Sequence, residues 1–477
     1  MDRKSGVLMH ISSLYGNYSI GSFGNEAKEF IDFLSECKFS YWQVLPFCMA
    51  DDCNSPYQSY STFAGNPYFV DLEILRSKGL ITDEQLNSQR QEQPFSCEYV
   101  KLYHTRIHLL YEASKKASNI DEINNFIDNN PYLKQFCEFM AYKESNNHLP
   151  WYKWTNKSYD QSILFMWKFI QYEFFTQWSE IKKYANSKNI KIIGDIPIYV
   201  SLDSADVWAN KEQFLLDEKN IPISIAGVPP DYFSEDGQLW GNPLYNWDKL
   251  KETGYKWWID RIKHMTNMFD GVRIDHFRGL ESFWAVPYGE KTAKNGKWIK
   301  GPGLDLINTI NNNIKDKIII AEDLGAITPE VIDLVEKSGY LNTRVFQFGF
   351  LSDEDNPHMP HNYINNCIAY TGTHDNNTLL GYLWELDEAN KKRMLDYCNY
   401  HSDDWEKGFD SIIRSLFSSC AGIVILPIQD LLGYGSDTRL NIPGKADGNW
   451  QFRITKEQLN NIDKNKFKHF NDLYKRS

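Results

Sequence analysis

Long apolar runs are missing from this 477-residue sequence, whose purely apolar stretches are strand-sized, such as residues 423–427. A helix that spans a membrane needs about 20 consecutive apolar residues, so we predict no membrane span. The N-terminal segment carries Arg3 and Lys4 but no apolar stretch of the kind found in signal peptides, which argues against a secretory signal peptide.

Closely spaced cysteine pairs are also missing. None of the eight cysteines belongs to a Cys-x-x-C pair, and no His or Cys cluster has the spacing of metal ligands. The sequence therefore gives no support to a zinc site or to thioredoxin chemistry. Scattered thiols in a chain that is not secreted indicate a reduced, cytoplasmic protein.

Basic runs are the third absence. Lys and Arg number 51 and Asp and Glu number 63, which gives a net charge of −12. An acidic chain without a basic run is a poor candidate for binding nucleic acid. It also lacks the polybasic clusters that hold proteins on anionic lipid.

Aromatic residues, by contrast, are abundant at 15% of the chain, with 15 Trp, 28 Tyr and 28 Phe. Most of them are expected in a large core. Others are candidates for lining a sugar-binding groove, because the flat apolar face of a pyranose matches a rigid aromatic ring. Composition does not choose between these two interpretations.

Short β-branched runs predict eight strands, and most are nearly continuous apolar runs, as in strands buried on both faces of a parallel sheet. The runs are residues 6–12, 41–46, 190–196, 271–275, 318–322, 344–348, 368–373 and 422–427. Helical patterns lie between them, including residues 27–37, 329–338 and 404–419, and Thr455 with Gln458 has capping-box spacing for a C-terminal helix. The alternation predicts an α/β fold, a (β/α)8 barrel.

Two connections are too long for simple crossovers, and we expect both to be insertions into one catalytic domain covering residues 1–477. The insertion at residues 55–189 is predicted to be mainly helical, with helices at 101–117, 131–145 and 162–188. The insertion at residues 200–269 is rich in Gly, Pro, Asp and aromatic residues. Long connections of this kind are usually functional loops, so we predict that it binds substrate.

Acidic residues occur at or just after the ends of four predicted strands: Asp195, Asp275, Glu322 and Asp375. In this fold the carboxyl ends of the strands are where catalytic groups converge. Each residue alone has a structural alternative, namely pairing with a nearby arginine or capping the next helix. Four of them at one rim are harder to explain in that way.

The local sequence suggests different roles for these carboxylates. Arg273 and Asp275 share one face of a strand, so the guanidinium is expected to lower the pKa of Asp275 and keep it ionised as a nucleophile; a structural ion pair is the alternative. Glu322 follows an apolar run, so burial is expected to raise its pKa toward that of a general acid, although Asp323 could equally be the rim residue. Asp375 sits in a polar cluster that could hold sugar hydroxyls or form an Asx turn.

One ionised carboxylate and one protonated carboxyl describe a glycosidase-type site. The retaining mechanism needs its two carboxyls about 5 Å apart. Neighbouring barrel strands, which lie about 4.8 Å apart, supply that spacing.

The motifs match a known family. They are SPYQSYSTFAGNPYFVDL (55–72), GDIPIYV (194–200), GVPPDYFSEDGQLWGNPLYNW (227–247), DGVRIDHFRG (270–279), AEDLG (321–325), GTHDNNT (372–378) and DGNWQFR (447–453). Together and in this order, they closely resemble the amylomaltases, or 4-alpha-glucanotransferases, of glycoside hydrolase family 77. The resemblance runs from residue 6 to residue 453. Only about 50 residues follow the eighth predicted strand, too few for the C-terminal β-sandwich of ordinary α-amylases.

The resemblance assigns roles residue by residue. It implies Asp275 as nucleophile, Glu322 as general acid and base, and Asp375 as stabiliser of the transition state. The sugar-contacting positions it implies are Ser55, Tyr57, Asp195, Arg273 and His374, and those of the acceptor-side loop are Tyr232, Phe233, Gln238 and Trp240.

The sequence is therefore interpreted as a cytoplasmic 4-alpha-glucanotransferase without metal or organic cofactor. Its expected partners are α-1,4-glucans such as maltodextrins, amylose, glycogen or starch, with glucose as an acceptor, and its expected state is a monomer or homodimer. Two alternatives are an α-1,4-glucan hydrolase with the same chemistry and a non-catalytic maltodextrin-binding protein. The second is disfavoured, because binding a sugar requires no nucleophile.

Overall fold

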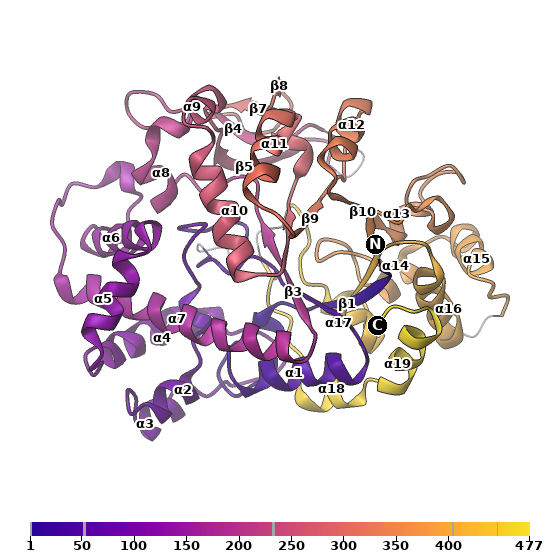
Figure 1. Ribbon diagram of the computed structural model, residues 1–477, viewed down its shortest axis with the longest axis horizontal. Helices are drawn as coiled ribbons and strands as arrows, with labels where there is room; N and C mark the ends of the chain where they lie inside the picture. The colour runs from indigo at the N-terminus through magenta and orange to yellow at the C-terminus, as the bar shows by residue number, and fades with distance from the viewer. Residues whose placement is uncertain (1, 51–53, 231–233, 403–404, 446) are drawn as a thin grey trace.

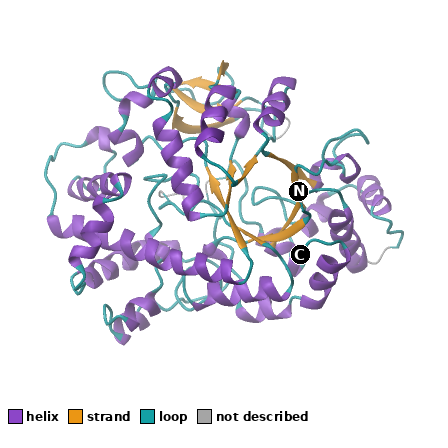
Figure 2. Cartoon of the chain, in the orientation of Figure 1, coloured by secondary structure: helices purple, strands orange, loops and turns teal. Residues whose placement is uncertain are grey.

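The eight predicted strands close into one parallel barrel in the computed structural model, which describes all residues except 1, 51–53, 231–233, 403–404 and 446 (Figures 1 and 2). Their spatial order around the ring is β1-β12-β11-β10-β9-β6-β3-β2. The bounds are β1 Lys4–Leu8, β2 Tyr41–Gln43, β3 Lys191–Ile196, β6 Gly271–Ile274, β9 Ile318–Ala321, β10 Leu341–Val345, β11 Cys367–Tyr370 and β12 Ile423–Pro427. The predicted (β/α)8 fold is confirmed.

Burial on both faces explains why these strands could be predicted as apolar runs in the sequence. Every residue of β2, β6, β11 and β12 is buried, as expected for strands between a filled barrel and its helices. The prediction for β10 is displaced: residues 344–348 were expected, but the strand is Leu341–Val345, because the chain turns into helix α13 (Phe346–Gly349).

Helices surround the barrel (Figure 2). Thr455 forms the predicted capping box with Gln458 and begins α18 (Lys456–Asn461). The other helices outside the two long insertions are α1 Asn25–Glu36, α11 Gly303–Asn313, α12 Pro329–Ser338, α14 Leu379–Glu385, α15 Glu388–Tyr397, α16 Trp405–Ser418, α17 Ile428–Leu432 and α19 Lys464–Leu473. Among the described residues, no helix combines the length and apolarity needed to cross a membrane.

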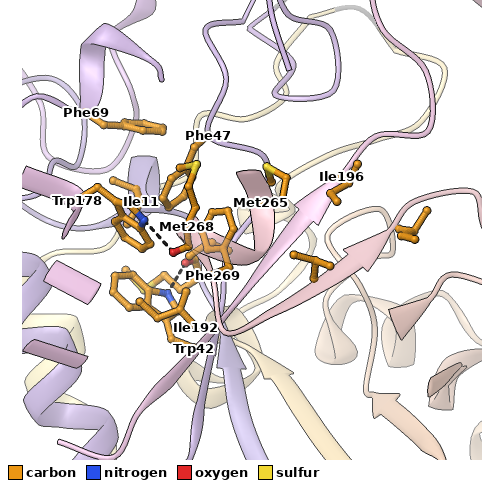
Figure 3. Packing of buried hydrophobic residues seen from close by; sticks show 14 of the residues in the cluster. Ile11, Trp42, Phe47, Phe69, Trp178, Ile192, Ile196, Met265, Met268 and Phe269 are labelled. Carbon is orange, nitrogen blue, oxygen red and sulfur yellow. Dashed lines mark hydrogen bonds between the residues drawn. The ribbon is translucent and has the colours of Figure 1, made fainter. Parts of the chain in front are cut away.

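The connection between β2 and β3 carries a group of helices on one side of the barrel (Figure 1). They are α2 Leu72–Ser77, α3 Asp83–Asn87, α4 Tyr99–Ser114, α5 Ile120–Asp128, α6 Pro131–Ser145 and α7 Gln161–Ser187. The long α7 joins this group to the barrel: the Trp178 ring lies 4.7 Å from the Phe47 ring, and its Nε1 donates to the Met268 carbonyl at 3.1 Å (Figure 3). The aromatic contacts fix the insertion against the barrel wall.

A second, antiparallel sheet stands beside the barrel, and the sequence analysis did not predict it. Its order is β5-β4-β7-β8, with β4 Ser224–Val228, β5 Gln238–Pro243, β7 Ser282–Pro287 and β8 Lys297–Lys300. The segment 200–269 therefore holds two strands and the helices α8 (Ala205–Ala209), α9 (Trp247–Glu252) and α10 (Lys256–Met268), not only loop. Because β7 and β8 come from the connection after β6, two connections share this sheet.

Candidate active site

The four predicted carboxylates come from strands whose carboxyl ends meet at one rim of the barrel. Asp195 lies in β3, Asp275 directly follows β6, and Glu322 directly follows β9. The backbone ladder continues past the strands, since Asp275 N donates to the Ile196 carbonyl at 2.9 Å and Glu322 N to the Ile274 carbonyl at 3.1 Å. Asp275 and Glu322 are therefore neighbours on adjacent strands.

Arg273 is the central cation of the site. Its Nη1 donates to Asp195 Oδ2 at 2.7 Å and its Nη2 pairs with Asp275 Oδ1 at 2.9 Å. The contact with Asp275 confirms that the two side chains share one face of β6. Tyr57 Oη donates to the same Asp195 oxygen at 2.8 Å. One buried arginine thus links three of the predicted site residues.

The pKa of Asp275 differs from the sequence-based prediction. Burial raises it to about 6, and Asp195 and Asp375 add to the shift, whereas Arg273 opposes it. Arg273 thus lowers the pKa of Asp275 as predicted, but the net shift is upward and not downward, because desolvation of the carboxylate outweighs the ion pair. The side chain still retains 27% exposure, which leaves it open to a ligand.

Glu322 is more enclosed, with 7% exposure. As predicted, burial raises its pKa, here to about 7, and the nearby Asp275 acts in the same direction. Its Oε2 accepts from the backbone N–H of His276 at 2.7 Å. That N–H is aimed by a left-handed backbone at His276, with φ of 49°, a conformation that non-glycine residues rarely adopt and that clusters at functional sites.

Asp323, the alternative to Glu322 as the catalytic carboxyl, binds residues of strand β10. Its Oδ1 accepts from Thr343 N at 2.7 Å, and its Oδ2 accepts from Asn342 Nδ2 and Arg344 Nη1, each at 3.2 Å. These contacts bind the carboxylate to β10. Glu322 is therefore the member of the pair that faces Asp275.

Asp375 is held from two sides. Its Oδ1 accepts from Asn441 Nδ2 at 2.6 Å, and its Oδ2 lies 3.4 Å from His374 Nε2. Although burial acts in the opposite direction, these contacts lower the pKa of Asp375, and Asp375 in turn raises the pKa of His374 against the effect of burial. The lowered pKa keeps Asp375 ionised, and its side chain is partly exposed.

Aromatic rings flank the carboxylates. Tyr57 stacks on His374 with ring centroids 5.2 Å apart, and Trp450 lies 5.9 Å from each of them. On another side, the Trp240 ring stands at 88° to the His276 ring, 4.8 Å away. These rings give flat apolar surfaces next to charged groups, the combination expected where sugars bind.

The remaining predicted residues have supporting contacts. Ser55 Oγ accepts from Tyr57 N at 3.3 Å, and Gln238 Oε1 accepts from Trp240 Nε1 at 3.2 Å. Asp195 is fully buried, with 0% exposure, which favours a role in holding Arg273 and Tyr57. Tyr232 and Phe233 lie outside the described residues.

Several residues of the site were missed by the sequence analysis. His276 and Trp450 fall within the sequence motifs given above, so the motifs contain the signal that could identify them. Asn441 lies in no quoted motif, and its contact with Asp375 joins positions 66 residues apart. Only the folded chain reveals that pairing.

A cavity of about 660 Å³ adjoins the aromatic side of the site. It reaches from His10, Pro56 and Trp450 to Tyr103 on α4 and His148 after α6. Aromatic side chains from several segments line it, among them Tyr60, Tyr68, Tyr99 and Trp167. The cavity has the size and lining of a site for a ligand larger than a single sugar.

Comparison with known proteins gives consistent matches over nearly the whole chain. The model of glycoside hydrolase family 77, described as 4-alpha-glucanotransferase, matches residues 9–459. A 4-alpha-glucanotransferase of Clostridium butyricum is 42% identical, with 98% of this chain and 100% of the relative covered. The structure of an amylomaltase from Streptococcus agalactiae in complex with acarbose aligns with a TM-score of 0.96 at 38% identity and covers 100% of both chains.

Proposed function

Since the chain belongs to the 4-alpha-glucanotransferase family, glycoside hydrolase family 77, we propose that it transfers α-1,4-glucan segments by a retaining double displacement through Asp275. Its donors are maltodextrins, and its acceptors are maltodextrins or glucose. The observation that carries this proposal is the pair of carboxyls that follow the adjacent strands β6 and β9, with Glu322 enclosed and Asp275 partly open. Adjacent strands match the short carboxyl separation of the retaining mechanism.

In the first step, an Asp275 carboxylate oxygen attacks the anomeric carbon while the bond to the glycosidic oxygen breaks. Glu322 gives its proton to that leaving oxygen. The product is a covalent glycosyl-enzyme of inverted configuration. The elevated pKa of Glu322 suits this role, because a general acid must be protonated near the working pH.

In the second step, Glu322 removes the proton from the 4-hydroxyl of an acceptor glucan. The resulting oxygen attacks the anomeric carbon, the ester to Asp275 breaks, and the α-configuration is restored. Asp375, held by Asn441 and His374, stays ionised and holds hydroxyls of the distorted sugar. Arg273 and Asp195 hold Asp275 and Tyr57 in place.

The acceptor side of the site is assigned to Tyr232, Phe233, Gln238 and Trp240. Support comes from the position of Trp240, whose ring contacts His276, the residue that directly follows Asp275 and whose N–H binds Glu322. A ring there would favour a sugar over water and help to exclude water from the glycosyl-enzyme. This feature favours transferase over hydrolase activity.

Incubation with maltotriose tests the transfer. Because the acceptor side binds a sugar, we expect glucose and a ladder of maltodextrins longer than maltotriose, resolved by chromatography. A product mixture of glucose and maltose alone would identify a hydrolase.

The pH dependence follows from the two carboxyl pKa values. Asp275 must be ionised, so activity should fall as the pH decreases through about 6. Glu322 must be protonated, so activity should fall as the pH increases through about 7. A bell-shaped profile of kcat/KM with its maximum between these values is expected.

With a glycosyl fluoride, whose leaving group needs no acid, Glu322→Gln should lose the alkaline limb for fluoride release. An alkaline limb that persists in this variant would contradict the role of Glu322.

A cytoplasmic location and a single catalytic domain with insertions at 55–189 and 200–269 complete the proposal. The location is supported by the seven described cysteines, which are all free thiols, as is usual in a reducing compartment. Treating the chain as one domain is supported by the barrel itself, which pairs β1 near the N-terminus with β12 near the C-terminus.

A further inference from the structure

Gln58 has every polar atom of its side-chain amide in a hydrogen bond. Its Nε2 donates to the Trp240 carbonyl at 3.2 Å and to Asn242 Oδ1 at 3.1 Å. Its Oε1 accepts from Ser201 Oγ at 2.8 Å and from Asn242 Nδ2 at 3.3 Å. The amide therefore fastens together the loop after β2, the loop after β3, and strand β5.

The backbone beside Gln58 strengthens this junction. Ser59 N donates to Ser201 Oγ at 3.0 Å, and Asn242 Nδ2 donates to the Val200 carbonyl at 3.0 Å. The six hydrogen bonds use side chains from three separate segments. A fully satisfied polar network of this kind specifies one arrangement of the segments that it joins.

The junction lies between the two halves of the active site. On one side, the neighbouring Tyr57 binds Asp195, which binds Arg273 and through it Asp275. On the other side, Trp240 contacts His276, whose N–H binds Glu322. Gln58 is one residue from Tyr57 and bonds directly to the Trp240 backbone.

We infer that Gln58 is a positioning residue that sets the distance between the acceptor wall at Trp240 and the glycosyl-enzyme at Asp275, and so sets the ratio of transfer to hydrolysis. The inference rests on the proposed function. Gln58 acts through Trp240, because its amide bonds to the backbone that carries this ring. Formation of the glycosyl-enzyme depends on Asp275 and Glu322, whereas the Gln58 amide bonds to Trp240, Asn242 and Ser201.

Loss of the amide should therefore act on the second step. A displacement of about 1 Å of a positioning group lowers a rate by up to roughly 100-fold. Release of the backbone bond to Trp240 should raise the KM for an acceptor sugar by about 10-fold, and the ratio of transfer to hydrolysis should fall by a similar factor. Fluoride release from a maltosyl fluoride, which reports the first step, should change by less than about twofold.

The test compares two variants with a matched control. Gln58→Met removes all four side-chain hydrogen bonds at similar volume, and Gln58→Glu keeps both accepted bonds but loses the two donated ones. Gln171→Met is the control. Gln171 is buried and binds Gly65 N and O at 2.8 and 3.0 Å, so its amide hydrogen bonds hold the same loop at Gly65 and not at Ser201 or β5. Each variant is assayed for fluoride release and for partition between glucose and water.

In both Gln58 variants we expect a lower ratio of transfer to hydrolysis and a higher KM for the acceptor. In Gln171→Met we expect the wild-type ratio of transfer to hydrolysis. An unchanged partition in the Gln58 variants would overturn the inference. An equal loss in Gln171→Met would also overturn it, because general loosening of the loop would then explain the effect. If the wild-type protein transfers nothing to glucose, it is the proposed function that fails.

Discussion

Replacement of Asp275 by Asn should lower the rate of glycosyl transfer by on the order of 10⁵-fold, as removal of an enzymatic nucleophile does. The amide has the shape of the carboxylate but does not form the glycosyl ester. The natural measurement is the initial rate on maltotriose, followed by glucose release. Arg273 would keep Asp195 as a partner, so the fold should survive the change.

Asp323→Asn is the matched control, because Asp323 is a second carboxylate at the same rim but is buried and binds β10. It should lower thermal stability and leave the rate per folded molecule within about tenfold of wild type. Asp275→Ala should in addition accept azide in place of the lost nucleophile, which gives an inverted glycosyl azide from an α-maltosyl fluoride. Retained transfer in Asp275→Asn would remove Asp275 from the mechanism.

Asp375→Asn should lower kcat by roughly 10²–10³-fold, the usual loss when one electrostatic contact to the transition state is removed. The substitution keeps the shape of the side chain and an acceptor for Asn441 Nδ2, but it removes the charge near the developing oxocarbenium ion. KM should change by a smaller factor, because the contact strengthens in the transition state. Steady-state kinetics with maltotriose measures both quantities.

Asn441→Ala separates positioning from charge. Asn441 donates to Asp375 Oδ1 at 2.6 Å, so its loss should free the carboxylate without removing it. A decrease in kcat of about 10-fold is expected, smaller than that of Asp375→Asn. If Asp375→Asn raised KM and left kcat unchanged, Asp375 would bind the ground state and the transition state equally and would not be a specific stabiliser of the transition state.

The barrel strands could be predicted because burial on both faces leaves a signature in local sequence. β12, with the sequence IVILP, is apolar throughout and buried at every position. The second sheet left no such signature. β8 is the four-residue segment KWIK, which is largely exposed. Nine residues separate it from the end of its partner β7, too many for a hairpin-turn motif to indicate the pairing. The pairing of β7 with β4 joins the connection after β6 to the connection after β3.

The site shows the same division between local and long-range information. The position of a carboxylate at the end of a strand can be read from the chain, and so can its spacing from Arg273. The depth of burial cannot be read from the chain. For this reason the predicted net direction of the pKa shift was wrong for Asp275 and right for Glu322. Gln58 was missed as a site residue because its partners lie 143 and 184 residues away.

The central claim is that Asp275 and Glu322 divide the chemistry as nucleophile and acid, and one measurement tests it directly. Glu322→Gln is mixed with an α-maltosyl fluoride, and the intact protein and its peptides are weighed by mass spectrometry. Fluoride leaves without a proton, but the second step lacks its base, so a maltosyl adduct should accumulate on the peptide that contains Asp275. An adduct on another residue, or one trapped by Asp275→Asn and not by Glu322→Gln, would contradict the account.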